Sequence, residues 1–295
     1  MDFLSILTTP PSTDYELLDS GDGEKLERYG TYFFRRPDPQ ALWDKRLDEK
    51  EWDKAHFSFR RDGKKGDWVI KSGVPERWQV HIGGLGFWIR PTAFKHTGLF
   101  PEQLPNWEWM SERIAHRKSQ SSDPVKVLNL FGYTGGATLA AAQAGAEVVH
   151  VDGSKVAIGW GKDNAALSEL KEKPIRWLLD DARAFVTREI RRGNKYEGVI
   201  LDPPAFGHGP KKELWKIEDH LPGLLRDCVS ILSEQPLFFL INGYASGYSA
   251  ITYENNIKPL LEKYGGSYEK GELTISESHS ERMLPCGIFA RWSGV

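Results

Sequence analysis

From Val125 onward the chain alternates short apolar runs with helix-prone stretches, and this alternation limits the fold more than any other feature. Strands separated by helices are typical of a parallel sheet that is covered by helices on both faces. The sequence therefore predicts an α/β fold with a doubly wound, mostly parallel sheet. The predicted strands are 125–131, 147–151, 175–179, 198–201 and 237–241, and the predicted helices are 137–144, 155–170, 182–192, 211–232 and 251–264. Two last apolar runs, 272–276 and 288–292, have no helix between them and predict an antiparallel hairpin at one sheet edge.

The first 95 residues follow another pattern. Strand-like runs at 31–34, 56–59, 68–70 and 78–82 are separated by glycine-containing turns, which predicts a small β-rich N-terminal domain over 1–95. Residues 96–124 are expected to connect the domains through a helix near 107–118, and residues 125–295 to form the sheet domain. Five of the eleven tryptophans precede residue 96. Large aromatic side chains in a small β domain more often fill its core than stack on nucleic acid bases, so we expect core packing.

Charge and cysteine content exclude several classes of protein. The 39 basic and 41 acidic side chains give a net charge of −2, so the chain is not a polycation drawn to nucleic acid, although a local basic patch stays compatible with this balance. Two cysteines are too few for a disulfide framework or a cysteine-built zinc site. No apolar run approaches the roughly 20 residues that span a bilayer, and the start lacks an export signal. We expect a cytoplasmic protein without a metal or a membrane partner.

The first predicted strand of the sheet ends in a glycine-containing turn, Asn-Leu-Phe-Gly-Tyr-Thr-Gly-Gly at 129–136. Glycines allow a sharp turn and bring backbone N–H groups against a ligand at the start of the next helix. The spacing is not G-x-G-x-x-G, and no Lys-Ser/Thr follows as in a phosphate loop, so a pyrophosphate site is disfavoured. A loop around a small zwitterionic group fits better. A plain strand-to-helix turn remains the alternative.

Acidic side chains follow the next two predicted strands. Asp152 ends the second strand, where a carboxylate can accept hydrogen bonds from both hydroxyls of a ribose. Asp181 follows the third strand, where a carboxylate can accept from an exocyclic amine of a base. Both positions also suit residues that cap or begin a helix, as do the neighbouring Ser154 and Ala182. The functional and the structural interpretations both stay open at these positions.

The fourth strand ends in Asp202-Pro203-Pro204-Ala205-Phe206, the most specific signal in the chain. Two prolines fix φ and remove two N–H donors, which leaves acceptors in the crevice beyond the strand ends. Asp202 and the carbonyl of Pro203 can then accept from an –NH2 group, and Phe206 offers a ring on which a flat base can stack. We expect Tyr244, after the fifth strand, to flank the same ring. The following stretch, 206–212, is predicted as a loop, either a mobile lid or simply solvated.

These motifs together resemble the class I S-adenosylmethionine-dependent methyltransferases, over about residues 95–292. The segments Asn-Leu-Phe-x-Tyr-Thr-Gly, Asp-Pro-Pro-x-Phe and Thr97–Gln103 are similar, more narrowly, to bacterial ribosomal-RNA large-subunit methyltransferases. The resemblance implies a seven-stranded sheet whose last strand is antiparallel, S-adenosylmethionine as cofactor and RNA as substrate. It assigns transfer to Asp202 and Pro203 and substrate contact to Pro204, Phe206 and Tyr244. The cofactor contacts that it implies are Phe131, Gly132, Tyr133, Thr134, Gly135, Asp152, Ser154, Asp181 and Ala182, with Thr97 and Gln103 entering from the side.

Other functions remain open at this stage. The sequence is also compatible with a methyltransferase that acts on a protein or a small metabolite, because residues 1–60 match no recognisable RNA-binding module. The missing G-x-G-x-x-G motif argues against a nicotinamide-dependent oxidoreductase. The presence of Asp-Pro-Pro-x-Phe argues against a non-catalytic binding module. Carbon methylation through a cysteine thiolate is disfavoured, because Cys228 lies in a helical apolar repeat and Cys286 beside the last strand.

Overall fold

A computed structural model describes residues 3–62, 65–92, 95–244 and 247–294. The chain divides into two compact units. The sheet unit comprises Met1–Leu7, Pro105–Glu272 and Gly287–Val295, and the N-terminal unit comprises Thr8–Leu104 and Leu273–Cys286. The sequence-based domains, 1–95, 96–124 and 125–295, are consecutive stretches, whereas each of these units combines segments from distant parts of the chain. Residues of β1 (Ser5–Thr9), β16 (Ser267–Ser276) and β17 (Met283–Ser293) contribute to both units.

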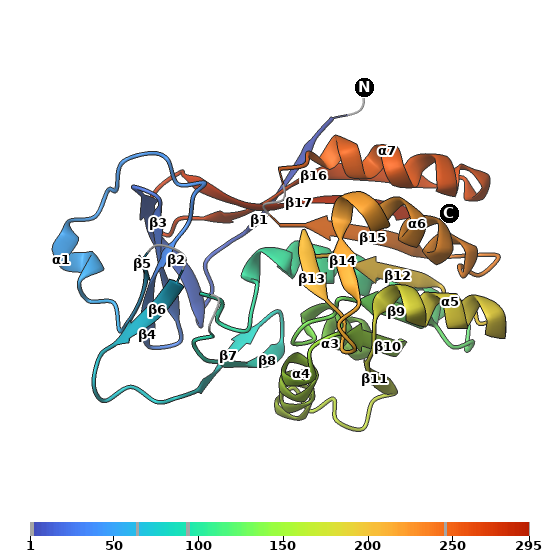
Figure 1. The fold of residues 1–295 in the computed structure, drawn as a ribbon, viewed down its shortest axis with the longest axis horizontal. Helices are drawn as coiled ribbons and strands as arrows, with labels where there is room; N and C mark the ends of the chain where they lie inside the picture. The colour runs from blue at the N-terminus through green and yellow to red at the C-terminus, as the bar shows by residue number, and fades with distance from the viewer. Residues whose placement is uncertain (1–2, 63–64, 93–94, 245–246, 295) are drawn as a thin grey trace. The chain divides into compact units, whose positions relative to one another are not determined.

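The central sheet has the strand order β1-β16-β17-β15-β12-β9-β10-β11 (Figure 1). Strands β15, β12, β9, β10 and β11 pair in parallel, and β17 pairs antiparallel with β15. The α/β fold and the antiparallel last strand are thus confirmed, with β1 as an added eighth strand. The remaining strands of this sheet are β9 (Lys126–Leu130), β10 (Glu147–Asp152), β11 (Ile175–Leu179), β12 (Gly198–Leu201) and β15 (Phe238–Gly243).

Helices cover the sheet on both faces because successive side chains of a strand point to opposite sides. Leu128 and Leu130 of β9, with the matching residues of β12 and β15, join one apolar cluster with α5, α6 and α7. Asn129 of β9 contacts α3 on the other face, and Phe238 of β15 packs edge-on against Trp109 of α2. The helices are α2 (Leu104–Gln120), α3 (Gly136–Gln143), α4 (Lys155–Leu167), α5 (Ala182–Arg192), α6 (Ile217–Ser230) and α7 (Ala250–Leu261), with 3-10 turns at Pro101–Gln103 and Glu262–Tyr264.

The strand order places a topological switch between β12 and β9. The chain proceeds outward from β9 through β10 to β11 and then returns to β12 on the other side of β9. Ligands of such sheets bind beyond the carboxyl ends of the strands at this point, where the connections leave in opposite directions. None of the helices in the described part of the chain is both long and apolar enough to cross a membrane.

The N-terminal unit is rich in β structure, as predicted. A five-stranded sheet has the order β2-β3-β4-β5-β6, and β7 and β8 form a separate hairpin. Trp52 and Trp78 are buried, and Phe34 stacks on Phe57 with ring centroids 4.6 Å apart, so aromatic residues fill a core as expected. The elements are β2 (Tyr15–Gly21), β3 (Glu24–Tyr29), β4 (Tyr32–Pro37), α1 (Glu49–Trp52), β5 (Phe57–Asp62), β6 (Lys65–Ile70), β7 (Trp78–Ile82) and β8 (Leu85–Ile89).

A segment from near the end of the chain completes this unit. Glu277, which follows β16, accepts hydrogen bonds from the backbone N–H of Ser20 at 2.9 Å and from the Ser20 hydroxyl at 2.5 Å. An isolated bridge also pairs Leu17 with Glu277. Glu277 is buried, so these bonds replace the water that its carboxylate loses.

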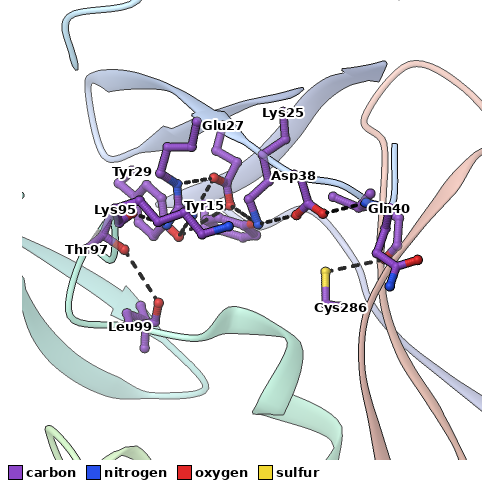
Figure 2. A network of polar contacts seen from close by, with 12 residues as sticks. Tyr15, Lys25, Glu27, Tyr29, Asp38, Gln40, Lys95, Thr97, Leu99 and Cys286 are labelled. Atoms are coloured by element: carbon purple, nitrogen blue, oxygen red, sulfur yellow. Dashed lines mark hydrogen bonds and ion pairs between the residues drawn. The ribbon is translucent and has the colours of Figure 1, made fainter. Parts of the chain in front are cut away.

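A buried group of charges lies within the N-terminal unit (Figure 2). Glu27 forms ion pairs with Arg36 and, at 3.7 Å, with Lys25, and the Tyr15 hydroxyl donates to it at 2.9 Å. Burial alone would raise the pKa of Glu27, but the charges of Arg36 and Lys25 outweigh burial and lower it. Lys25 also pairs with Asp38 at 3.3 Å. The buried charges of this group are paired with one another, so removing the central carboxylate of Glu27 leaves buried cations without this partner.

We expect Glu27→Gln to lower the free energy of unfolding by about 3–5 kcal/mol, the cost of breaking a buried ion pair. Urea denaturation measures the change. The matched control is Glu16→Gln, whose pair with Arg28 at 3.1 Å is partly exposed and is expected to contribute about 0–1 kcal/mol. Equal losses for the two variants would contradict the assignment.

Candidate functional site

The glycine-containing turn leaves β9 at the switch point in an unusual backbone conformation. Phe131, Tyr133 and Gly135 have φ values of +57°, +50° and +92°. A left-handed conformation at non-glycine residues is costly and persists where surrounding contacts fix it. Here the N–H of Gly132 donates to the Val151 carbonyl at 3.1 Å, and Asn164 Nδ2 donates to the Thr134 carbonyl at 3.0 Å. Strand β10 and helix α4 therefore hold the loop rigidly open toward the crevice.

Two rings support this loop from below, those of the buried His150 and the half-buried Trp177. A Cβ on Gly132 would lie 2.4 Å from His150 Cε1, and one on Gly135 would lie 3.2 Å from Trp177. His150 is fully buried, its Nδ1 lies 2.8 Å from the Thr138 hydroxyl, and its ring lies 4.5 Å from that of Trp177. The glycines are thus required by close approach as well as by backbone conformation.

Sequence reasoning missed this support. His150 lies within the apolar run that forms β10, and its position beside Asn129 of β9 places both on the same face of the sheet. Asn129 Nδ2 donates to the Thr138 hydroxyl at 2.9 Å, so the three side chains form a buried polar chain. A histidine and an asparagine at matched positions of two buried strands were the available signal.

We expect Gly132→Ala to weaken binding of S-adenosylmethionine at least 10-fold and to lower the free energy of unfolding by about 1–3 kcal/mol, because the new methyl group collides with the His150 ring. Isothermal titration calorimetry and urea denaturation measure the two effects. Gly159→Ala in α4 is the control, since nothing lies within 4 Å of its added Cβ. Wild-type affinity in Gly132→Ala would refute the close-approach argument.

Burial lowers the pKa of His150 to about 3 from an ordinary value of 6.5. Between these values the unfolded chain binds a proton that the folded chain does not, so this group makes stability rise with pH and fall as acid is added. We expect it to contribute a slope of about 1.4 kcal/mol per pH unit between pH 4 and 6. Urea denaturation across this range should show a shallower slope for His150→Gln, and identical slopes would contradict the depressed pKa.

The two predicted nucleoside carboxylates lie at neighbouring strand ends, as expected. Asp152, half-buried, accepts hydrogen bonds from the N–H groups of Tyr133 at 2.8 Å and of Ser154 at 2.7 Å. Burial raises its pKa, and these two bonds counteract the increase. Asp181 caps α5 by accepting from the N–H of Ala184 at 2.9 Å. A carboxylate oxygen has a second lone pair, so both residues remain able to accept a ligand hydroxyl or amine.

Ser154 and Ala182 occupy structural positions next to these carboxylates. Ser154 caps α4, where its hydroxyl accepts from the N–H of Ala157 at 3.2 Å, and Ala182 is the first residue of α5. The structural interpretation is thus confirmed for Ser154 and Asp181 as helix caps. The nucleoside contacts of Asp152 and Asp181 stay a prediction, which these hydrogen bonds do not exclude.

The prediction of a loop over 206–212 is confirmed for 209–212 and wrong for 206–208, which form a strand. Strand β13 (Phe206–His208) pairs antiparallel with β14 (Leu214–Lys216), so α6 begins at Ile217 and not at residue 211. The turn of this hairpin packs on the carboxylate side of the crevice: a Cβ on Gly153 would lie 3.3 Å from the His208 carbonyl, and one on Gly209 would lie 3.2 Å from Asp181 Cβ. The helical pattern of the lysine-containing stretch was misleading because backbone pairing within the hairpin overrides it.

Asp202 lies at the carboxyl end of β12, across the switch point from the glycine-containing turn. The side chain is half-buried, and burial raises its pKa to about 6. Among the described residues no donor or cation contacts its carboxylate. The Pro204 carbonyl accepts from Trp215 Nε1 at 2.6 Å, which fixes the turn and leaves the Pro203 carbonyl free. Phe206 and Tyr244 are 57% and 37% exposed, so both rings are accessible.

The remaining sequence-predicted residues are placed as follows. Thr97 and Gln103 belong to the N-terminal unit, and their contact with the cofactor stays a prediction. Cys228 is fully buried in α6, as expected, and burial raises its pKa. Cys286 is buried in the N-terminal unit, and burial raises its pKa too. Within the described ranges no group of three or more His, Cys, Asp or Glu side chains is arranged to hold a metal ion.

Comparison with known proteins identifies the family. A family model described as S-adenosylmethionine-dependent methyltransferase matches residues 54–245. The chain belongs to this family. A S-adenosylmethionine-dependent methyltransferase from Agrobacterium tumefaciens has a crystal structure that is similar to the methyltransferase described here with a TM-score of 0.93 and 41% identity, over 98% of this chain and 93% of that one. A Streptococcus mutans protein described as a methyltransferase has the same fold, with a TM-score of 0.69 and 19% identity over 98% and 76% of the two chains.

Curated relatives of this methyltransferase carry ribosomal RNA in their names. The Neisseria meningitidis ribosomal RNA large subunit methyltransferase K is 23% identical over 77% of this chain and 64% of its own length. The Chromohalobacter salexigens ribosomal RNA large subunit methyltransferase K/L is 30% identical over 54% of this chain and 20% of its own length. The methyltransferase thus spans less than two thirds of these relatives.

The cofactor of the family is S-adenosylmethionine, and the site fits it. Gly132 and Gly135 let the loop lie directly against His150 and Trp177, and Asp152, whose carboxylate accepts from the N–H of Tyr133 at 2.8 Å, lies beside the loop. The absent G-x-G-x-x-G motif is consistent with a cofactor that has no pyrophosphate.

Proposed function

We propose that this methyltransferase transfers the methyl group of S-adenosylmethionine to a base nitrogen, an amine or a ring nitrogen, of ribosomal or other RNA. The names of the curated relatives support an RNA substrate. The observation that carries the proposal is the carboxylate of Asp202 at the switch point, which no described donor or cation contacts, together with the exposed ring of Phe206. A ribosomal RNA substrate implies that the enzyme acts in the cytoplasm.

An unpaired, partly buried carboxylate favours a ligand that donates hydrogen bonds. Desolvation without a partner costs free energy, which a donor on the substrate recovers. Asp202 and the Pro203 carbonyl together offer acceptors for an amine, and they orient its nitrogen lone pair. The rings of Phe206 and Tyr244, with Pro204, would hold the base flat. The positioning itself supplies much of the rate acceleration, on the order of 7–11 kcal/mol in well-aligned systems.

The cofactor supplies a methyl group activated by a sulfonium. We assign the methionine end to Phe131, Gly132, Tyr133, Thr134 and Gly135, the ribose to Asp152 and Ser154, and the adenine to Asp181 and Ala182, with side contacts from Thr97 and Gln103. A methylated nitrogen must lose a proton. Asp202, with a pKa near 6, accepts this proton at neutral pH and releases it to water.

Transfer of a labelled methyl group from S-adenosylmethionine to the RNA, protein and metabolite fractions of the source cell tests the proposal. Label in RNA, mapped to a base nitrogen, is expected. Label in protein or in a small metabolite alone would replace the RNA assignment with the alternative that the sequence left open.

We expect Asp202→Asn to lower kcat by about 10²–10⁴-fold while S-adenosylmethionine binds within twofold of wild type. Because the ionised carboxylate is the accepting form, wild-type kcat/KM should fall about tenfold per unit below pH 6. The variant should lack this decline. Asp219→Asn, an exposed change in the first turn of α6, is the control. An unchanged pH profile in Asp202→Asn would reject Asp202 as the acceptor.

A further inference from the structure

A groove runs along β11, the strand at the edge of the sheet, outside the site described above. Two hollows of about 560 and 510 Å³ share Arg176 of β11. The first lies at the amino ends of β9, β10 and β11, and the second extends along α5 to the turn of the β13–β14 hairpin at Pro210 and Lys211. We call the two hollows together the edge groove. It leads from the far edge of the sheet to the hairpin turn beside Asp181.

The edge groove is strongly basic in a chain whose net charge is −2. Three acidic side chains line it, Glu147, Asp180 and Glu189. Asp180 pairs with Arg188, and Glu189 pairs with Arg192 at 2.8 Å. The seven cationic side chains that line it are Lys126, Lys173, Arg176, Arg188, Arg192, Lys195 and Lys211.

Four of these cations, Lys126, Lys173, Arg176 and Lys211, are exposed and have neither an ion pair nor a side-chain hydrogen bond with the described residues. They line both hollows, two of them on or near β11, which is about 17 Å long. The excess positive charge is therefore spread along the groove and is not concentrated at one position.

We propose that the edge groove binds the phosphate backbone of the RNA substrate and guides the strand toward Asp202. The inference rests on RNA being the methyl acceptor. A row of uncompensated cations matches the repeated single charges of a phosphate backbone. β11 is also the terminal strand, so its outer backbone N–H groups are unpaired by a neighbouring strand and add donors for phosphate oxygens. Hydrophobic side chains also line the groove and offer apolar surface to the bases. They are Val149, Ile175 and Leu178.

Binding of a labelled 20-nucleotide single-stranded RNA of mixed sequence tests the groove independently of methyl transfer. Fluorescence anisotropy from about 50 to about 200 mM salt gives the slope of log K against log salt. Lys173→Gln combined with Arg176→Gln should reduce the magnitude of that slope by about 1.4, or 0.7 for each lost phosphate contact, and weaken binding about 10-fold. Binding of S-adenosylmethionine and the melting temperature should stay unchanged.

The matched control removes the same two charge types elsewhere. Arg226→Gln in α6 combined with Lys263→Gln after α7 leaves the groove intact, so its slope should equal that of wild type. Wild-type slope and affinity in the groove variant, or an equal loss in the control, would overturn the proposal.

The labelling experiment separates failure of the groove from failure of the proposed function. Label in RNA together with an unaffected groove variant rejects the edge groove alone. Label only in protein or metabolites, with no RNA binding by wild type, rejects both.

Discussion

The site depends on one constraint, the close approach of a glycine-containing loop to the rings of His150 and Trp177. Gly132 and Gly135 lie directly on these rings, so the loop after β9 cannot move down into the sheet. Helix α4 holds the Thr134 carbonyl, and β10 holds the N–H of Gly132. The crevice is therefore shaped by packing within the sheet, and the carboxylates at the strand ends only provide its polar contacts.

Charges of opposite sign gather on different parts of the sheet. The carboxylates of Asp152, Asp181 and Asp202 lie at the carboxyl ends of β10, β11 and β12, where they can accept from hydroxyls and amines. The cations of the edge groove lie along the side of the same sheet. Since the 39 basic and 41 acidic side chains nearly cancel over the whole chain, net charge says little about what each surface binds.

The parallel sheet could be predicted closely from sequence because its strands are short apolar runs between helices. The bounds of β11, α5 and β12 agree with the predicted ranges, since a proline, a glycine or an acidic residue flanks each element on both sides. The β13–β14 hairpin was missed because its strands have only three residues each and a polar turn, which gives no periodic signal. The supporting roles of His150 and Trp177 depend on which strands are neighbours, and a linear pattern of residues does not contain that information.

The interlaced chain has a consequence for folding during synthesis. The N-terminal unit contains Leu273–Cys286, and Glu277 in that segment satisfies backbone and hydroxyl groups of Ser20. A ribosome must therefore translate past Glu277 before this unit can close. Until then the N-terminal strands lack the buried side chain of Glu277. Contacts between residues more than 250 positions apart make the last step of folding slow.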